Sequence, residues 1–403
     1  MKNYHLPKKL TQAICEEPYR LFFPLGILMG MFGIGHWLLY GFDLSHDYSG
    51  FFHAAFQIWL YMGCLVLGFL LTAIPRFAMA PHAKTGEILW FLLLFLSIFS
   101  FLLAGQWIAA ETCYMVWLLS LAVFIAKRFL RKKVQYPPTE FIWIPVAILH
   151  AIIGTSTVIA SQLQLIDAGN IEIGRSMVEQ GFMLSLVLGV GGFLGPRLMG
   201  SYELPSPENL RTSISASRKR RLAIHGIAIF LFGLSFWLEG THEDFKGYAL
   251  RALVVTAELL WTRALLLRLP AIRSLFTKLV WISFWMVAVG AWATTFFPKL
   301  HKEMLHLEFI GGFSLMTFAV AAMVVLSHSG EGKRLHRLLW IWGWIGSGLF
   351  VALILRLIVP FFSNYYFIVL GAASGVWIVT AAGWLFFAVP FLLRVPENHN
   401  SLL

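Results

Sequence analysis

Long apolar stretches alternate with short polar connections along almost the whole chain. Most stretches are about twenty residues long, which is enough to cross about 30 Å of hydrocarbon as a helix. A backbone in lipid must satisfy its own hydrogen bonds, so the stretches predict helices and not open strands. They lie near residues 21–41, 51–74, 87–109, 112–127, 141–160, 177–197, 222–239, 249–267, 279–297, 304–326, 337–359 and 365–390. The pattern predicts an all-α polytopic transmembrane helix bundle of about twelve spans.

The composition excludes a soluble globular protein. Of the 403 residues, 59% are hydrophobic and only 13% are charged, so the lipid bilayer must be the partner that covers the apolar surface. The net charge of +11 does not indicate a nucleic-acid partner, because the basic residues fall between the apolar stretches. The three cysteines form no CxxC pair and are too dispersed for a disulfide framework.

The charge of the connections alternates along the chain. Basic residues gather at 76–84, 127–133, 211–221, 263–278 and 333–337, whereas the intervening connections are acidic or nearly uncharged. Because cationic loops stay on the cytoplasmic side, this alternation predicts that both termini are cytoplasmic. We expect a multi-pass membrane protein.

A polar connection divides the predicted spans into two halves. It contains Pro205, Pro207 and a Ser/Thr-rich tract before the basic run that starts at Arg218, which is typical of a flexible hinge. The expected organisation is a cytoplasmic arm (1–20), a first six-span half (21–197), a cytoplasmic hinge loop (198–221), a second six-span half (222–390) and a cytoplasmic tail (391–403).

One predicted span carries a histidine at each end, His306 and His328. Helix geometry places these side chains about 40° apart around the axis and roughly 33 Å apart along it. They cannot ligate the same metal ion. Each would need a partner from another helix at its own depth, unless both simply face lipid head groups.

Other histidines lie at depths that match these two. His53 opens the second span on the same predicted side as His306, and two imidazoles from different helices are what a bis-histidine haem requires. His36 is a further candidate metal ligand on that side. On the other side, His328 lies near His336 and could share a second metal site with it. Interfacial histidines without a metal remain the alternative interpretation.

Two ionisable residues, Glu258 and His150, fall near the middle of their spans. Such groups normally face the bundle interior and have partners, so the two are expected to pair with each other. In a transporter the pair would serve as a proton relay, and otherwise it would be a structural hydrogen bond between helices.

Several short motifs resemble those of a known family. They are Pro18-Tyr19-Arg20-Leu21-Phe22-Phe23, Gly68-Phe69-Leu70-Leu71-Thr72-Ala73-Ile74-Pro75, and the set His306, Gly311, Met316, Thr317, His328 and Gly330. In order and spacing they are similar to the motifs of the NnrS family. These are multi-span bacterial membrane proteins associated with haem, copper and the response to nitric oxide.

The resemblance implies a multi-pass protein of the bacterial inner membrane, with haem b bound through some of His53, His306 and His328 and a role with nitric oxide or in nitrosative stress. It also implies copper, but Ala55 and Phe56 stand where the family has histidine and glutamate, which weakens that site. No catalytic reaction can be assigned. Two alternatives stay open: a twelve-span secondary transporter that uses Glu258 and His150, and a family member without a cofactor.

Overall fold

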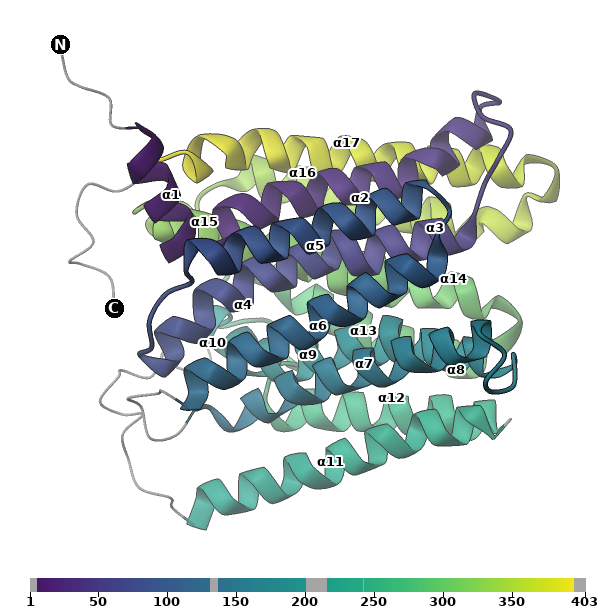
Figure 1. Ribbon diagram of the computed structural model, residues 1–403, viewed down its shortest axis with the longest axis horizontal. Coiled ribbons are helices and arrows are strands. Elements are labelled where there is room, and N and C mark those ends of the chain that lie inside the picture. The colour runs from purple at the N-terminus through teal and green to yellow at the C-terminus, as the bar shows by residue number, and fades with distance from the viewer. Residues whose placement is uncertain (1–5, 131–136, 201–215, 242, 395–403) are drawn as a thin grey trace. The chain divides into compact units, whose positions relative to one another are not determined.

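Figure 1 shows the computed structural model, which describes residues 6–130, 137–200, 216–241 and 243–394. In these residues, eleven helices are long and apolar enough to cross a membrane. They are Tyr19–Gly41, Gly50–Ala78, Thr85–Leu103, Trp107–Leu130, Thr139–Gln162, Asn170–Leu198, Arg218–Gly240, Leu275–Phe296, Pro298–His328, Leu339–Phe361 and Ser363–Leu392. This confirms the predicted polytopic helical fold.

The remaining predicted span, 249–267, is the helix α12 (Asp244–Trp261). It carries Asp244, Lys246, Arg251 and Glu258, too many charges for a span recognised by composition alone. Its Arg251 and Glu258 are buried, 2% and 3% exposed. The helix therefore has the length of a span, and its two buried charges have polar partners, Glu239 for Arg251 and His225 for Glu258.

Two predicted boundaries differ from the observed ones. The short stretch 112–127 is part of a helix of 24 residues, Trp107–Leu130, because the apolar first turn continues through Glu111 and Thr112 into that stretch. The stretch 87–109 is divided, because its helix ends at Leu103 and Gly105 adopts a φ of +66°. This left-handed backbone suits glycine, which has no Cβ.

The chain forms two compact units, and each contains segments that are distant in sequence. Unit 1 comprises Met1–Val134, Thr317–Gly348 and Leu370–Leu403, and unit 2 comprises Gln135–Met316 and Leu349–Val369. This division differs from the two consecutive halves expected from the hinge. Residues 201–215 of that hinge and 395–403 of the expected tail lie outside the described residues.

Unit 1 is built from antiparallel helices of the N-terminal part and from C-terminal segments. Its complete elements are α1 (Leu6–Glu16), α2 (Tyr19–Gly41), α3 (Gly50–Ala55), η1 (Phe56–Met62), α4 (Gly63–Ala78), α5 (Thr85–Leu103), α6 (Trp107–Leu130) and η8 (Gly332–Arg334). Helix α2 packs along η1 and α4, and α5 packs along α6. Segments of α15 (Leu315–His328), α16 (Leu339–Ile358) and α17 (Tyr366–Leu392) complete it.

Unit 2 holds the middle of the chain. Its complete elements are η2 (Thr139–Ile142), α7 (Trp143–Gln162), α8 (Asn170–Ser176), η3 (Met177–Gly181), α9 (Phe182–Leu186), η4 (Val187–Gly191), α10 (Gly192–Leu198), α11 (Ala216–Gly240), α12, α13 (Leu275–Phe296), η6 (Pro298–Leu300), α14 (His301–His306), η7 (Leu307–Ser314), η9 (Val359–Phe361) and η10 (Ser363–Tyr365). Helix α12 packs between α11 and α13, and α13 packs against η7.

Three spans contain π-helical turns: Gly50–Ala78 through η1, Asn170–Leu198 through η3 and η4, and Pro298–His328 through η7. They are also the most buried spans, with 83%, 83% and 72% of their apolar windows inside the protein. Single π turns within α-helices are frequent at functional sites.

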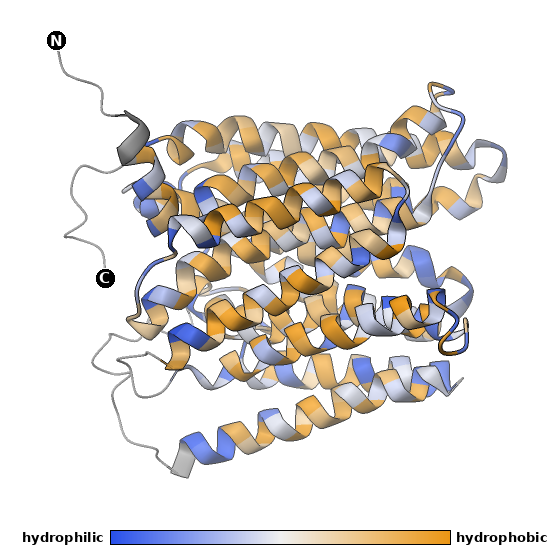
Figure 2. Ribbon diagram, in the orientation of Figure 1, coloured by the Kyte–Doolittle hydropathy of each residue, from blue (hydrophilic) through white to orange (hydrophobic). Residues whose placement is uncertain are grey.

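The apolar faces that remain exposed are those a bilayer would cover. Leu89, Leu93 and Leu96 on α5 are exposed, as are Ile227 and Phe230 on α11. Figure 2 shows apolar residues along the middle of these helices and hydrophilic residues near their ends. This distribution matches a hydrocarbon layer between two polar interfaces.

Candidate functional site

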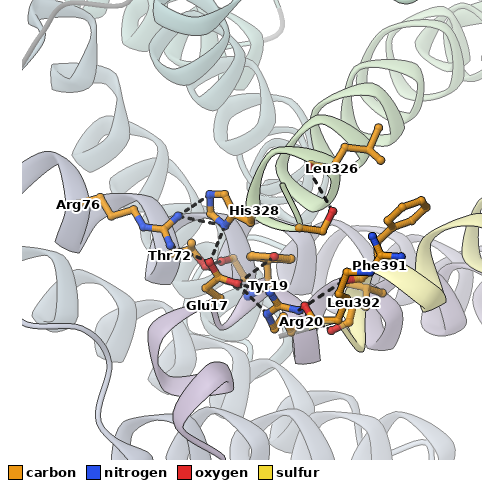
Figure 3. A network of polar contacts seen from close by, with 12 residues as sticks. Glu17, Tyr19, Arg20, Thr72, Arg76, Leu326, His328, Phe391 and Leu392 are labelled. Atoms are coloured by element: carbon orange, nitrogen blue, oxygen red, sulfur yellow. Dashed lines mark hydrogen bonds and ion pairs between the residues drawn. The ribbon is translucent and has the colours of Figure 1, made fainter. Parts of the chain in front are cut away.

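A network of charged side chains lies at the end of α15 in unit 1 (Figure 3). The Nδ1 atom of His328 is 3.1 Å from Oε1 of Glu17, and the ring lies edge-on to Tyr19, with ring centroids 5.1 Å apart. The Arg76 guanidinium contacts the ring nitrogens of His328 and donates to Oε1 of Glu17 at 2.9 Å. Glu17 is only 3% exposed.

The same carboxylate also holds the start of α2. Nε of Arg20 donates to Oε2 of Glu17 at 2.7 Å, and NH1 of Arg20 donates to the backbone oxygens of Leu392 at 2.6 Å and Arg394 at 3.0 Å. Burial by itself raises the pKa of the Glu17 carboxyl. The hydrogen bonds from His328 and Arg20 and the charge of Arg20 outweigh this effect and hold its pKa well below the ordinary value.

Close packing of α2 on α4 brings this network together. The backbone nitrogen of Tyr19 donates to Oγ1 of Thr72 at 3.3 Å, and Thr72 donates to the oxygen of Gly68 at 2.7 Å. A Cβ on Gly68 would lie 3.0 Å from the Cα of Tyr19, so glycine permits this approach. The first two stretches that resemble NnrS motifs thus meet in unit 1, together with His328 from the end of the third.

These contacts occupy both ring nitrogens of His328. A carboxylate can only accept and a guanidinium can only donate, so Nδ1 donates to Glu17 and Nε2 accepts from Arg76. The lone pair that a metal would need is therefore already used. His328 anchors the end of α15, and Glu17, which the sequence analysis missed, is its main partner. The position of Glu17 beside the Pro18 motif was the available signal.

A second cluster in unit 1 joins His36 of α2 and His53 of α3, with ring centroids 6.3 Å apart. Nδ1 of His36 donates to the backbone oxygen of Gly33 at 3.0 Å, because a carbonyl can only accept. In this tautomer the lone pair is on Nε2, which is buried and makes no hydrogen bond of normal geometry in the described residues, although the backbone of Ser49 also interacts with the ring. An imidazole held by a backbone oxygen at one nitrogen is typical of a metal-ligating histidine.

The spacing of the two rings fits a shared metal ion. Two imidazoles on opposite sides of one ion have centroids roughly 6 Å apart, from two bonds of about 2 Å and two ring radii of about 1 Å. The rings of Trp37 and Phe52 lie 4.5 Å and 5.4 Å from His36. Within the described residues no group of three or more His, Cys, Asp or Glu side chains could hold a metal ion, so an ion here would have these two imidazoles as its only ligands of this kind.

The other candidate histidines lie elsewhere. Nδ1 of His306 contacts the backbone oxygen of Lys302 at 2.6 Å, and its ring packs on Phe309. His306 belongs to unit 2 and His53 to unit 1, so the expectation that they face each other stays a prediction. His336 is exposed, in the connection between α15 and α16.

The two mid-span residues of unit 2 are both buried but have different partners from those expected. Glu258 contacts Nδ1 of His225 and accepts from Nε1 of Trp143 at 3.1 Å. His150 instead contacts the oxygen of Val146 in its own helix, at 2.9 Å. The expected pairing of Glu258 with His150 is corrected to one with His225, because α11 packs directly along α12.

Comparison with known proteins gives a family assignment. Residues 13–395 match the family model described as "NnrS protein". No curated protein matches the chain.

Proposed function

Since this chain belongs to the NnrS family, we propose that it is a metal-binding membrane protein of the nitric oxide or nitrosative-stress response. The observation that carries the proposal is the pair His36 and His53, two imidazoles from different helices at the spacing of one bound ion. The proposed ligand is copper, with haem b as the alternative group for the same pair. Either would supply a coordination position for a small ligand such as nitric oxide.

The residues around the pair would orient the ligands and exclude water. Gly33 fixes the tautomer of His36 through its backbone oxygen. Oγ of Ser49 accepts from the backbone nitrogen of Phe52 at 3.1 Å, and this cap fixes the first turn of α3, which carries His53. The rings of Trp37 and Phe52 cover the imidazoles, so a bound ion would lie in surroundings of low polarity.

Metal analysis and visible absorption of the purified protein test this proposal. The wild type should contain about one copper ion, or a haem with its Soret band, per chain. The variants His36→Ala and His53→Ala should each lose it, because one remaining imidazole binds far more weakly than two. The matched control is His46→Ala, which alters an exposed histidine in the connection between α2 and α3.

Each outcome of this experiment has a defined meaning. Copper without a Soret band identifies a bare ion, and a Soret band identifies haem with rearranged aromatic rings. Equal metal content in the His36→Ala and His46→Ala proteins would contradict the assignment. So would a wild-type protein that binds neither group after growth with copper and haem precursors.

The role with nitric oxide is tested separately. Addition of nitric oxide to the metal-loaded protein should change its absorption or electron paramagnetic resonance spectrum, and the His36→Ala/His53→Ala double variant should show no such change. Cells that produce the wild type should resist a nitric oxide donor better than cells that produce the double variant. Equal resistance would argue against this physiological role.

A further inference from the structure

The connection between α12 and α13, residues 262–274, combines exposed leucines with cations, and the metal proposal does not use it. Its backbone is not helical, and it contains no aspartate or glutamate. The exposed apolar side chains are Leu267, Leu269 and Ile272, with 76%, 56% and 39% of their surface exposed. The cations are Arg263, Arg268 and Arg273. Arg268 thus stands directly between the two most exposed leucines of the segment.

Neighbouring elements of unit 2 hold this connection in place. The backbone oxygen of Leu266 accepts from Nε1 of Trp281 at 2.7 Å and from Nε1 of Trp285 at 3.1 Å, both on α13. A Cβ on Gly200, just after α10, would lie only 2.8 Å from Cγ1 of Ile272. These contacts restrain the segment near both ends of its exposed part. A fixed backbone therefore presents the exposed leucines.

The two arginines of the exposed part have no carboxylate partner. The sequence contains no aspartate or glutamate between Glu258 and Glu303, and both of these have other partners. Arg268 and Arg273 are exposed, and neither forms a salt bridge with another described residue. A guanidinium is always charged and has only donors. These two side chains are therefore available to an anion from outside the protein.

The connection has the properties of a segment at a membrane surface. It joins α12, which has the length of a span, to the span α13. Irregular backbone is not exposed to lipid within the hydrocarbon, so this segment lies at the level of the head groups. Trp261, at the end of α12, is 45% exposed and belongs to a residue type enriched at this level. Leucines here can enter the acyl-chain region, and a guanidinium can hold a phosphate through two parallel hydrogen bonds.

We propose that residues 267–273 bind the head group of an anionic phospholipid. Leu267 and Leu269 enter the acyl chains, Arg268 and Arg273 bind the phosphate, and the two tryptophans of α13 hold the segment at this depth. An anionic lipid complements the two arginines, whereas a zwitterionic lipid brings a cation of its own to the same place. A water-soluble protein partner does not account for leucines exposed at the membrane surface, so lipid is the occupant that the observations favour.

Native mass spectrometry of the full-length protein in detergent tests this site. Dioleoylphosphatidylglycerol is the anionic probe and dioleoylphosphatidylcholine the zwitterionic one. The wild type should bind the anionic lipid more tightly. Arg268→Gln/Arg273→Gln should weaken binding of the first anionic lipid about thirtyfold, the effect of two cations near anionic lipid, and should leave the affinity for phosphatidylcholine unchanged. Equal affinity of the wild type and this variant for phosphatidylglycerol would overturn the proposal.

The matched control is Lys219→Gln/Arg220→Gln, which removes the same charge from the exposed start of α11. These cations lie on the same predicted side of the membrane but are not flanked by exposed leucines, so the affinity should remain close to that of the wild type. An equal loss in the two double variants would indicate general attraction of lipid to positive charge and would contradict a site in this connection. Displacement of the lipid by excess inorganic phosphate would contradict it too, because free phosphate has no acyl chains for the leucines to contact.

Wild-type protein in lipid bilayers supplies a measurement that does not depend on the variants. Phosphatidylglycerol with a diazirine in its acyl chain loses N2 on illumination, and the resulting carbene inserts into a nearby C–H bond. Mass spectrometry should find this label within residues 262–274, in greater yield than from phosphatidylcholine that carries the same chain. Absence of the label from this segment, or equal labelling by the two lipids, would count against the proposal.

Discussion

Among individual residues, Glu17 contacts side chains from three different helices of unit 1. It binds Arg20 at the start of α2, Arg76 at the end of α4 and His328 at the end of α15. Because each of these partners can donate to it and two are permanent cations, the carboxylate is stabilised even though it is buried. Its removal would leave buried donors without an acceptor, which makes it a sensitive position for the stability of this unit.

We expect Glu17→Gln to lower the free energy of unfolding by about 3 kcal/mol at neutral pH, as for the loss of one partner of a buried ion pair. The folded-state pKa of Glu17 lies below its unfolded value of about 4.3. Its contribution is therefore complete above that value and decreases as the pH falls toward the folded-state pKa. Thermal unfolding in detergent from pH 7 to about pH 3 measures both effects.

The neighbouring Glu16→Gln serves as its control. Glu16 accepts from Gln12 in an exposed hydrogen bond, so this variant should retain the wild-type transition and its acid sensitivity. If Glu17→Gln unfolds at the wild-type temperature throughout the pH range, the network does not stabilise unit 1.

At the scale of residues, the sequence predicted which histidines lie on the same side of the membrane better than it predicted which side chains they contact. The sequence placed His36 and His53 on the same side of the membrane, and the structure shows them in contact, as a pair that depth alone did not select. His328 was expected as a ligand, but Glu17 and Arg76 occupy its nitrogens. Which side chains meet depends on how each helix is rotated about its axis, and hydropathy does not determine this rotation.

At the scale of helices, length and hydropathy predicted nearly every span, whereas the π turns left no signal. A π turn shifts the backbone hydrogen bonds to i→i+5 without requiring a distinctive composition, so η3 and η7 read as ordinary apolar helix. The hydrogen bond from Gln180 to Glu308 was not predicted for this reason. The available signal was the position of Glu308 inside an apolar stretch, two residues after His306.

The contact between α7 and α8 gives a test of helix packing in unit 2. A Cβ on Gly154 would lie 2.5 Å from the backbone oxygen of Gly174, so the helices touch through their backbones here. We expect Gly154→Val to separate them and to destabilise the protein by about 1–3 kcal/mol, the usual cost of overpacking. Thermal unfolding measures the loss.

Gly226→Ala in α11 is the matched control, because no atom lies within 4 Å of the Cβ it would add. Alanine favours a helix over glycine by about 1 kcal/mol, so this variant should be as stable as the wild type or more stable. Equal behaviour of the Gly154 and Gly226 variants would show that the α7–α8 contact is not tight.

For the whole molecule, the alternation of charged connections predicts the orientation in the membrane. A reporter fused after Arg218 should be cytoplasmic, and one fused after Asp47 should lie outside, because cations are retained on the cytoplasmic side. Paired alkaline phosphatase and fluorescent protein fusions at both positions measure this. An external Arg218 fusion would reverse the assignment of every connection.

Unit 1 contains segments from the beginning and the end of the chain, and this determines when the protein can finish folding during synthesis. Arg20 emerges from the ribosome early, but the carbonyl oxygen of Leu392, to which it donates at 2.6 Å, emerges some 372 residues later. Throughout that interval a cation at the start of the first span lacks one of its final acceptors. Unit 1 therefore closes only when the last helices have been inserted. A ribosome that stops after the spans of unit 2 would leave behind an inserted but unfinished protein, a substrate for membrane quality control.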